Sequence, residues 1–357
     1  MRRVTAIGAV LSALLVAAAS AQASEVGPND FRISEAGPDG DAAYGAEQAD
    51  VAFNSVDDVF LVVWRGTDDV LAPGEHEIFA RLVSREGSPI GEQLRISDMG
   101  IDASSPAVAY DEAANQFLVV WAGDETGETE VYGQRLSGTG AGEVGVDDFQ
   151  ISQVGTDGIP TAGAQSPDVA YNPNNNRWFV VWAGDPGIAP LADDEFEVYG
   201  ELLDAGGGTV GISDFRISDM GPDGDPSYGA REPAVAHNSS ANNRFLVVWS
   251  GVDDAAPGES EIYGQLLVGA TVAETGGNDF RITTMGPDGD GAFAAAEPTL
   301  AFNPASGDFL AVWRGSDGAA GEYDIYGQRI TASGGQNGED DFRISTMGPD
   351  GNPAFAA

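Results

Sequence analysis

The chain has 357 residues, with 57 acidic side chains against 16 basic ones, two His and no Cys, and its formal charge is −41. So acidic a surface repels a nucleic-acid backbone, and the lack of Cys excludes disulfides, thiol nucleophiles and thiolate metal sites. With 42% hydrophobic residues the chain has enough apolar material for a folded core, which argues against wholesale disorder.

The first element in chain order is an export signal at residues 1–23. The start is basic, residues 4–19 are almost wholly apolar, and Ala21-Gln22-Ala23 has the small residues of a signal-peptidase site. The apolar run is short for a membrane span. We therefore predict cleavage and a mature chain, residues 24–357, that is secreted, periplasmic or on the cell surface, with no membrane insertion.

A repeat then fills the rest of the chain. Each unit carries an Ala-aromatic or Ala-His pair, a Val-Val-Trp or Ala-Val-Trp segment, a segment such as Ile-Tyr-Gly, and a closing segment such as Phe-Arg-Ile-Ser. The five tryptophans are Trp64, Trp121, Trp182, Trp249 and Trp313. The units span about 49–97, 106–152, 167–218, 233–283 and 298–345.

Each unit predicts four strands. The first strand alternates in polarity, the second is continuously apolar, as in residues 117–121, and the third and fourth alternate again. A strand that is apolar throughout is expected to be covered on both faces. Outside the signal, no stretch has a helical period.

Four short strands per unit and five units predict an all-β fold, a β-propeller of about five four-stranded blades in a single domain. Tandem immunoglobulin-like sandwiches are a rival, but each needs about 100 residues. A parallel β-helix, with shorter rungs, is a third alternative.

The closing segment also occurs once before the first unit, as Phe31-Arg32-Ile33-Ser34. Two explanations fit this extra copy. It completes the last blade and closes a five-bladed ring, which we favour, or the chain is a slice of a longer array.

The order of these segments resembles the repeat of TolB-type (WD40-like) propellers. The matching residues in the last unit are 298–302, 309–313, 324–326 and 343–345. The Val-Val-Trp, Ile-Tyr-Gly-Gln-Arg and Phe-Arg-Ile-Ser segments also resemble repeats of secreted bacterial surface proteins. The resemblance implies a propeller scaffold used for binding, and it brings no catalytic residue with it.

A Gly-Pro-Asp-Gly-Asp loop recurs between units and is the candidate metal site. Its paired carboxylates are Asp39 and Asp41, Asp223 and Asp225, and Asp288 and Asp290. Two carboxylates flanking a Gly can present oxygens to one Ca²⁺, although a calcium loop normally needs six or more oxygens. Pro-Asp-Gly is also a strong turn former, so both a calcium site and a bare turn remain open.

Two further groups of residues are candidates for function. Trp178 lies outside the repeat position of the other tryptophans and follows Arg177, so this pair is a candidate ligand-binding site. Acidic clusters such as Asp193-Asp194-Glu195 precede the third strands and are expected to be solvated loops.

The leading functional prediction is a non-enzymatic binding scaffold for a glycan or a surface protein, assisted by Ca²⁺ if the loops bind it. The alternatives are a carbohydrate-active hydrolase with carboxylates in a central channel, and a structural surface protein of a salt-adapted bacterium. A hydrolase would use single acids that break the repeat and face one channel mouth, whereas every acidic cluster noted above recurs in several units.

Overall fold

The computed structural model describes residues 31–346, except 36, 39–40, 42, 69–73, 125–126, 156–161, 241 and 318–321. The predicted signal peptide therefore lies outside the described residues. Among those that are described, no helix is long and apolar enough to cross a membrane.

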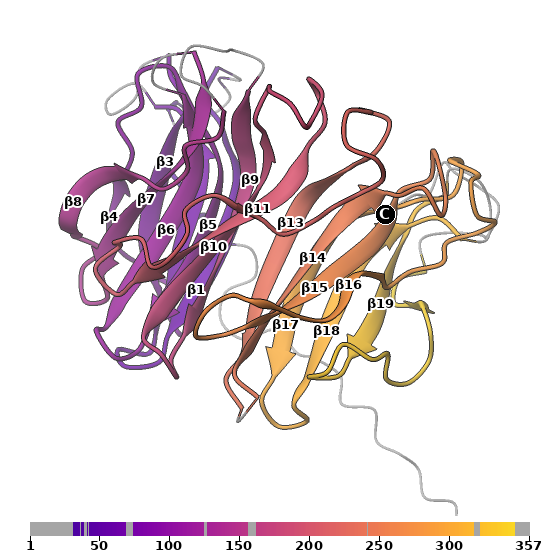
Figure 1. Ribbon diagram of the computed structural model, residues 1–357. Coiled ribbons are helices and arrows are strands. Elements are labelled where there is room, and N and C mark those ends of the chain that lie inside the picture. The colour runs from indigo at the N-terminus through magenta and orange to yellow at the C-terminus, as the bar shows by residue number, and fades with distance from the viewer. Residues whose placement is uncertain are drawn as a thin grey trace, which may run out of the picture.

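In the described part of the chain, twenty strands form five units of four, and within each unit consecutive strands pair in antiparallel fashion (Figure 1). Blade one has β1 (Ala46–Asn54), β2 (Val59–Gly66), β3 (Glu77–Ser84) and β4 (Pro89–Arg95). Blade two has β5 (Asp102–Asp111), β6 (Gln116–Asp124), β7 (Thr129–Ser137) and β8 (Glu143–Gln150). Blade three has β9 (Gly163–Asn172), β10 (Arg177–Asp185), β11 (Glu197–Asp204) and β12 (Phe215–Arg216). Blade four has β13 (Gly229–Asn238), β14 (Arg244–Val252), β15 (Glu261–Val268) and β16 (Glu274–Arg281). Blade five has β17 (Ala295–Asn303), β18 (Asp308–Gly315), β19 (Asp324–Ile330) and β20 (Phe342–Arg343).

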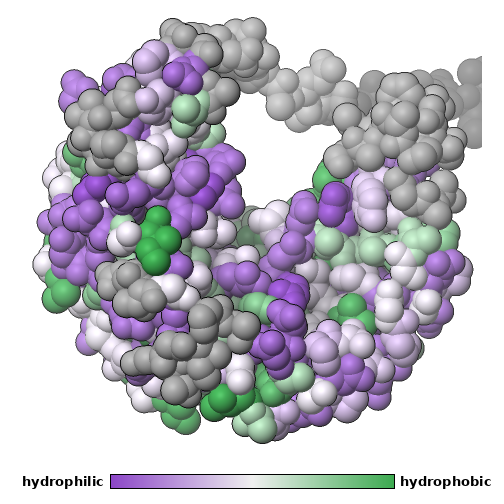
Figure 2. Space-filling model, turned by 90° about the horizontal axis from the view of Figure 1, so that it is seen from above, coloured by the Kyte–Doolittle hydropathy of each residue, from purple (hydrophilic) through white to green (hydrophobic). Residues whose placement is uncertain are grey.

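The blades follow one another around an axis, with their first strands innermost. β1 lies against β5, β5 against β9, β9 against β13, and β13 against β17. Seen from above, the described atoms curve round a hollow that is open on one side (Figure 2). The prediction of an all-β propeller with about five four-stranded blades is confirmed.

The apolar second strands form the core, as predicted from their composition. Trp121, Trp182 and Trp249 are fully buried, and Trp64 and Trp313 nearly so. Each second strand has two apolar faces. In blade one, Phe60, Val62 and Trp64 form what we call the tryptophan face, and Leu61 and Val63, with Ile78 of β3, form the leucine face.

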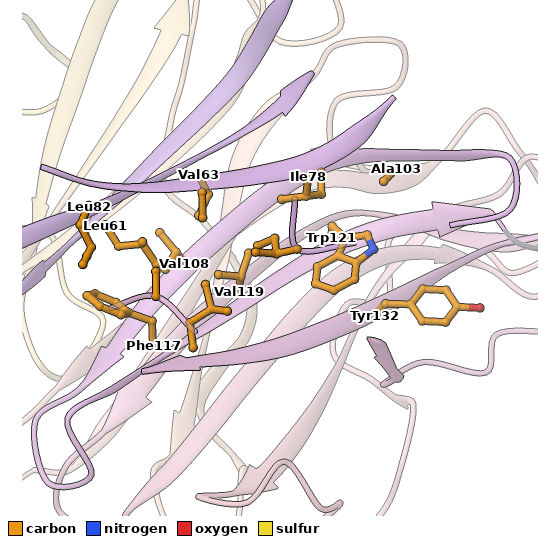
Figure 3. Packing of buried hydrophobic residues seen from close by; sticks show 14 of the residues in the cluster. Leu61, Val63, Ile78, Leu82, Ala103, Val108, Phe117, Val119, Trp121 and Tyr132 are labelled. Carbon is orange, nitrogen blue, oxygen red and sulfur yellow. The ribbon is translucent and has the colours of Figure 1, made fainter. Parts of the chain in front are cut away.

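The blades are joined by one kind of contact, in which the leucine face of a blade packs on the tryptophan face of the next. Between blades one and two, Leu61, Val63 and Ile78 meet Phe117 and Trp121 (Figure 3). The same pairing recurs between blades two and three, three and four, and four and five. Each interface therefore buries the apolar surface that the alternating pattern of the second strand provides.

Candidate active site

The five first strands line an axial cavity of about 400 Å³. Its walls are residues 48–50 of blade one and the corresponding 105–107, 166–168, 232–234 and 297–299 of the other blades. Three successive residues of each strand line the cavity. A regular strand does not allow this, because its side chains point alternately to opposite faces.

A β-bulge in each first strand accounts for this arrangement. The pairing with the second strand shifts register at the same point in all five blades. The bulged residue has a left-handed backbone, with φ of 52° at Gln48, 51° at Ser105, 52° at Ser166, 54° at Glu232 and 55° at Glu297. A bulge bends the strand and changes the direction in which side chains point, so these blades turn polar residues toward the axis.

Four carboxylates lie on the wall of this cavity, and they come from four blades. Asp50 belongs to blade one, Asp168 to blade three, Glu232 to blade four and Glu297 to blade five. At the position of Asp50 and Asp168 the other blades carry Ala107, Ala234 and Thr299. These two aspartates therefore break the repeat, which a purely architectural role does not require.

Asp50 and Asp168 are held in the same way. Asp168 Oδ2 accepts a hydrogen bond from the backbone N–H of Val235 in blade four at 2.7 Å, and Oδ1 accepts one from Val169 at 2.8 Å. Asp50 accepts from Val108 of blade two and from Val51, each at 2.8 Å. The hydrogen bonds thus fix the orientation of each carboxylate and link its blade to the next blade.

Burial sets the protonation of this pair. Burial is the main cause that raises the pKa of Asp168, the negative charge of Asp50 adds to it, and the two backbone hydrogen bonds lower it, so that the pKa lies at about 7. Burial also raises the pKa of Asp50. Near neutral pH the carboxyl of Asp168 therefore keeps a substantial share of its proton and is able to donate it.

The other two carboxylates lie at the bulges. Glu232 Oε2 accepts hydrogen bonds from Ser250 Oγ at 2.8 Å and from the backbone N–H of Glu297 at 2.9 Å, which links blades four and five. Glu297 Oε1 lies 3.2 Å from Arg314 Nη2. The cavity therefore holds several carboxylates in different surroundings, the arrangement in which one acts as an acid while another stays ionised.

The predicted metal residues lie away from the walls of this cavity. Asp223 pairs with Arg216, and Asp288 pairs with Arg281, each at 2.8 Å. Asp41, Asp225 and Asp290 cap their own turns, and Asp39 lies outside the described residues. Among the residues that the structure describes, no three potential ligand side chains gather as a metal would need. The calcium site stays a prediction.

Buried glutamates hold these loops in place. Glu195 Oε2 accepts from the backbone N–H of Gly224 at 2.8 Å, and Glu259 Oε2 accepts from that of Gly289 at 2.6 Å. Both glutamates are 0% exposed. The expectation that the acidic clusters before the third strands are solvated is therefore wrong for these two residues, because their carboxylates satisfy the backbone of the neighbouring turn. It is also wrong for three further glutamates of these clusters that are 0% exposed, namely Glu77, Glu197 and Glu261.

Trp178 lies in the core, although the sequence made it a candidate ligand contact. Its side chain is 0% exposed and packs in the interface between blades two and three, with its ring centroid 4.8 Å from that of Tyr171. Arg177 is half-buried beside it. Trp178 occupies the position of Phe117 and Phe245 in neighbouring blades, so it replaces one buried aromatic ring with another.

Sequence reasoning missed the four axial carboxylates. The acidic clusters that it considered all recur between units, whereas Asp50 and Asp168 differ from their counterparts in the other blades. An alignment of the five first strands would have found them, as polar substitutions in a column that is otherwise Ala or Thr.

No family model matches this chain, and neither does any curated protein. Solved structures with a similar fold include a Hadza microbial sialidase, with a TM-score of 0.49 and 12% identity over 76% of this chain and 55% of that one. A thermostable family-43 glycoside hydrolase has a TM-score of 0.46 and 11% identity over 87% of this chain and 96% of that one. An N-acetylgalactosamine deacetylase from F. plautii, in complex with blood group B trisaccharide, has a TM-score of 0.42 and 15% identity over 68% and 71%.

The prediction of a non-enzymatic binding scaffold is therefore corrected. The three solved structures named above are of a deacetylase, a glycoside hydrolase and a sialidase, which are enzymes and not binding scaffolds. Their likeness is one of fold at low identity, and by itself it assigns no activity. The observation on this chain is the axial cavity, which is lined by carboxylates from different blades, two of which, Asp50 and Asp168, break the repeat. This is the pattern that the hydrolase alternative expects.

Proposed function

We propose that this protein is a carbohydrate-active hydrolase whose acid–base carboxylates lie in the axial cavity. The observation that carries the proposal is the pair Asp50 and Asp168, which break the repeat at the same depth of two blades and line one cavity. Hydrolysis of a glycosidic bond needs one carboxyl group to protonate the leaving oxygen and a second to act as a base or nucleophile.

Asp168 is the proposed general acid. Its raised pKa of about 7 keeps the carboxyl protonated into the neutral range, as an acid that protonates a glycosidic oxygen must be. The hydrogen bonds from Val169 and Val235 fix the direction of its oxygens. Asp50 is the proposed partner that is ionised while Asp168 keeps its proton, because the negative charge of Asp50 disfavours ionisation of Asp168.

Glu232 and Glu297 are the proposed substrate-binding groups at the cavity mouth. Carboxylate oxygens accept hydrogen bonds from sugar hydroxyl groups, and both side chains line the cavity at the bulges. The proposed substrate class is a neutral or cationic glycan, because a cavity with four carboxylates repels an anionic one.

The test is a hydrolysis screen of the mature chain, residues 24–357, on nitrophenyl glycosides and neutral polysaccharides. On any substrate that is turned over, we expect Asp168→Asn to lower kcat by about 100- to 10,000-fold. The control is Asp225→Asn, because Asp225 caps an exposed turn and does not line the cavity. Circular dichroism checks that each variant is folded.

The pH profile gives a second measurement. Because Asp168 has to be protonated to act, we expect activity to fall as the pH rises through about 7. An Asp168→Asn variant that is folded and as active as the Asp225→Asn control would refute the assignment. Failure of the mature chain to hydrolyse any glycoside across pH 4–9 would refute the proposed function.

We also propose that the protein works outside the cytoplasm. The support is the signal-peptide pattern of residues 1–23. N-terminal sequencing of protein recovered from culture medium and cell fractions tests it. We expect the mature chain to begin at Ser24.

A further inference from the structure

The ring has two free apolar faces at its open side. Among the described residues, no preceding blade covers the tryptophan face of blade one. Val51 is 54% and Phe53 45% exposed, whereas Val108, Val169 and Val235 at the position of Val51 are 5–8% exposed. Among the described residues, no contact between β17 and β1 is comparable to those that join the other first strands.

The leucine face of blade five is open in the same way. Ile344 is 50% exposed, whereas its counterparts Ile96, Ile217 and Ile282 are each 2% exposed. Leu310 and Val312 are only half-buried, whereas Leu61 and Val63 are 0% exposed. Four interfaces in this chain join a leucine face to a tryptophan face, so the two free faces are the two halves of interfaces of the same kind.

The extra closing segment, residues 31–35, indicates what kind of element fits between the leucine face of blade five and the tryptophan face of blade one. In the other blades, the backbone N–H two residues after the closing Ile donates to an acidic side chain of the next blade, as Asp98 does to Asp148 Oδ2 at 2.9 Å and Asp219 to Asp279 Oδ2 at 3.0 Å. Glu35 does the same, and its N–H donates to Oε1 of Gln93, the counterpart of Asp148, at 2.7 Å.

Packing confirms this equivalence. A Cβ on Gly87 of blade one would come within 2.9 Å of the Phe31 ring, just as one on Gly207 of blade three would meet the Phe149 ring of blade two at 2.9 Å. Ile33 packs against Trp64 and Phe79 of blade one. Residues 31–35 thus lie on blade one as the fourth strand of a preceding blade would, and not as an addition to blade five.

We propose that the open side of the ring takes three strands of a further repeat unit of this type, which form a sixth blade with residues 31–35 as its fourth strand. In the complete blades the closing segment is bound by the third strand. Ile96 N–H donates to the Ile78 carbonyl at 2.9 Å, and Ser97 Oγ donates to Glu77.

The test supplies such a unit. A copy of residues 231–268, which includes the three inner strands of blade four without a closing strand, is appended after Ala357 of the mature chain. The matched control carries Leu246→Asp and Val248→Asp in the copy, which place two charges on the leucine face that has to meet Trp64. Sedimentation establishes the oligomeric state of all three proteins.

In the fusion we expect amide hydrogen exchange of residues 31–35 to slow by about tenfold or more, hydroxyl-radical labelling of Phe53 to fall, and the melting temperature to rise. The control fusion is expected to match the unfused chain. Three results would overturn the proposal. The first is a folded fusion with unchanged exchange at 31–35. The second is an unfused monomer in which 31–35 and Phe53 are already protected, which means that five blades close directly. The third is protection that appears only in a dimer of the unfused chain, which makes a second copy the occupant.

Discussion

The buried carboxylate at the start of each third strand offers a sharp test of how the blades are held. Glu77, Glu130, Glu197, Glu261 and Asp324 occupy this position, and each accepts a hydrogen bond from the Ser or Thr of its own closing segment. Four blades also place an Arg beside the carboxylate, as Arg216 does at 2.7 Å from Glu197 Oε1. Blade two carries Gln150 instead of this Arg.

We expect Gln150→Arg to stabilise the protein at pH 8. Burial raises the pKa of Glu130 to about 7, so above that pH the fold has to keep a charged carboxylate in the core. A hydrogen bond to a charged group contributes about 1.5–3 kcal/mol, and ordering an Arg side chain costs up to about 2 kcal/mol. The net gain is therefore about 1 kcal/mol, or about 1–2 °C in the melting temperature for a chain of this size.

Thermal melts at pH 8 and pH 5 measure the effect. At pH 5 Glu130 is protonated, so most of the gain is expected to disappear. The control is Gln153→Arg, which adds the same charge at an exposed position nearby. It measures the stabilisation that comes only from reducing the negative net charge of the protein. Equal stabilisation by the two variants, or a gain that persists at pH 5, would refute the role of Glu130.

Three further predictions follow from the same structure. Burial raises the pKa of Glu77, Glu130 and Glu197 to about 7, far above the value in an unfolded chain. Their contribution to stability is therefore fully present at low pH, where they are protonated, and is lost as the pH rises through 7. The melting temperature is therefore expected to rise from pH 8 to pH 5, and less so in Glu130→Gln. Trp182→Ala removes a fully buried indole from the interface between blades two and three, and we expect it to lower the free energy of unfolding by about 3–5 kcal/mol in a urea titration. The control is Val146→Ala, at a 70% exposed side chain, which is expected to lower it by less than about 0.5 kcal/mol. The calcium prediction requires a rise in melting temperature that is specific to Ca²⁺ over Mg²⁺ and is lost in Asp225→Asn; an equal response to both ions indicates screening of charge alone.

The fold was accessible from the sequence because its main signal is local and repeated. Five apolar second strands that end in Trp predict sheets covered on both faces, and Trp121, Trp182 and Trp249 are fully buried. The place of Phe31-Arg32-Ile33-Ser34 was not accessible in this way. Its pattern identifies a closing strand, but the pattern does not give the contacts of Ile33 and Glu35 with blade one, on which the proposal of a further blade rests.

The candidate site was harder to predict, since it depends on backbone geometry that alternation of polarity does not encode. The left-handed residue at Gln48, Ser105 or Glu232 shifts the register of the first strand, so positions that a regular strand would separate line one cavity. Asp168 looks like an ordinary edge residue in sequence. Its pKa is raised by burial and by the negative charge of Asp50, which belongs to another blade and is distant along the chain. Neither cause is visible in the residues next to Asp168.

Each blade packs only against its neighbouring blades, and this determines how the molecule responds to force. Every interface between described blades repeats the same leucine-to-tryptophan contact, and within the described residues the first and last blades have this contact on one side alone. When tension is applied at the two ends of the chain, we expect the first and last blades to unfold before the middle ones, because each of them is stabilised by a single interface. A force–extension trace should then be a staircase of similar steps, with the sheet of β9–β12 among the last to come apart.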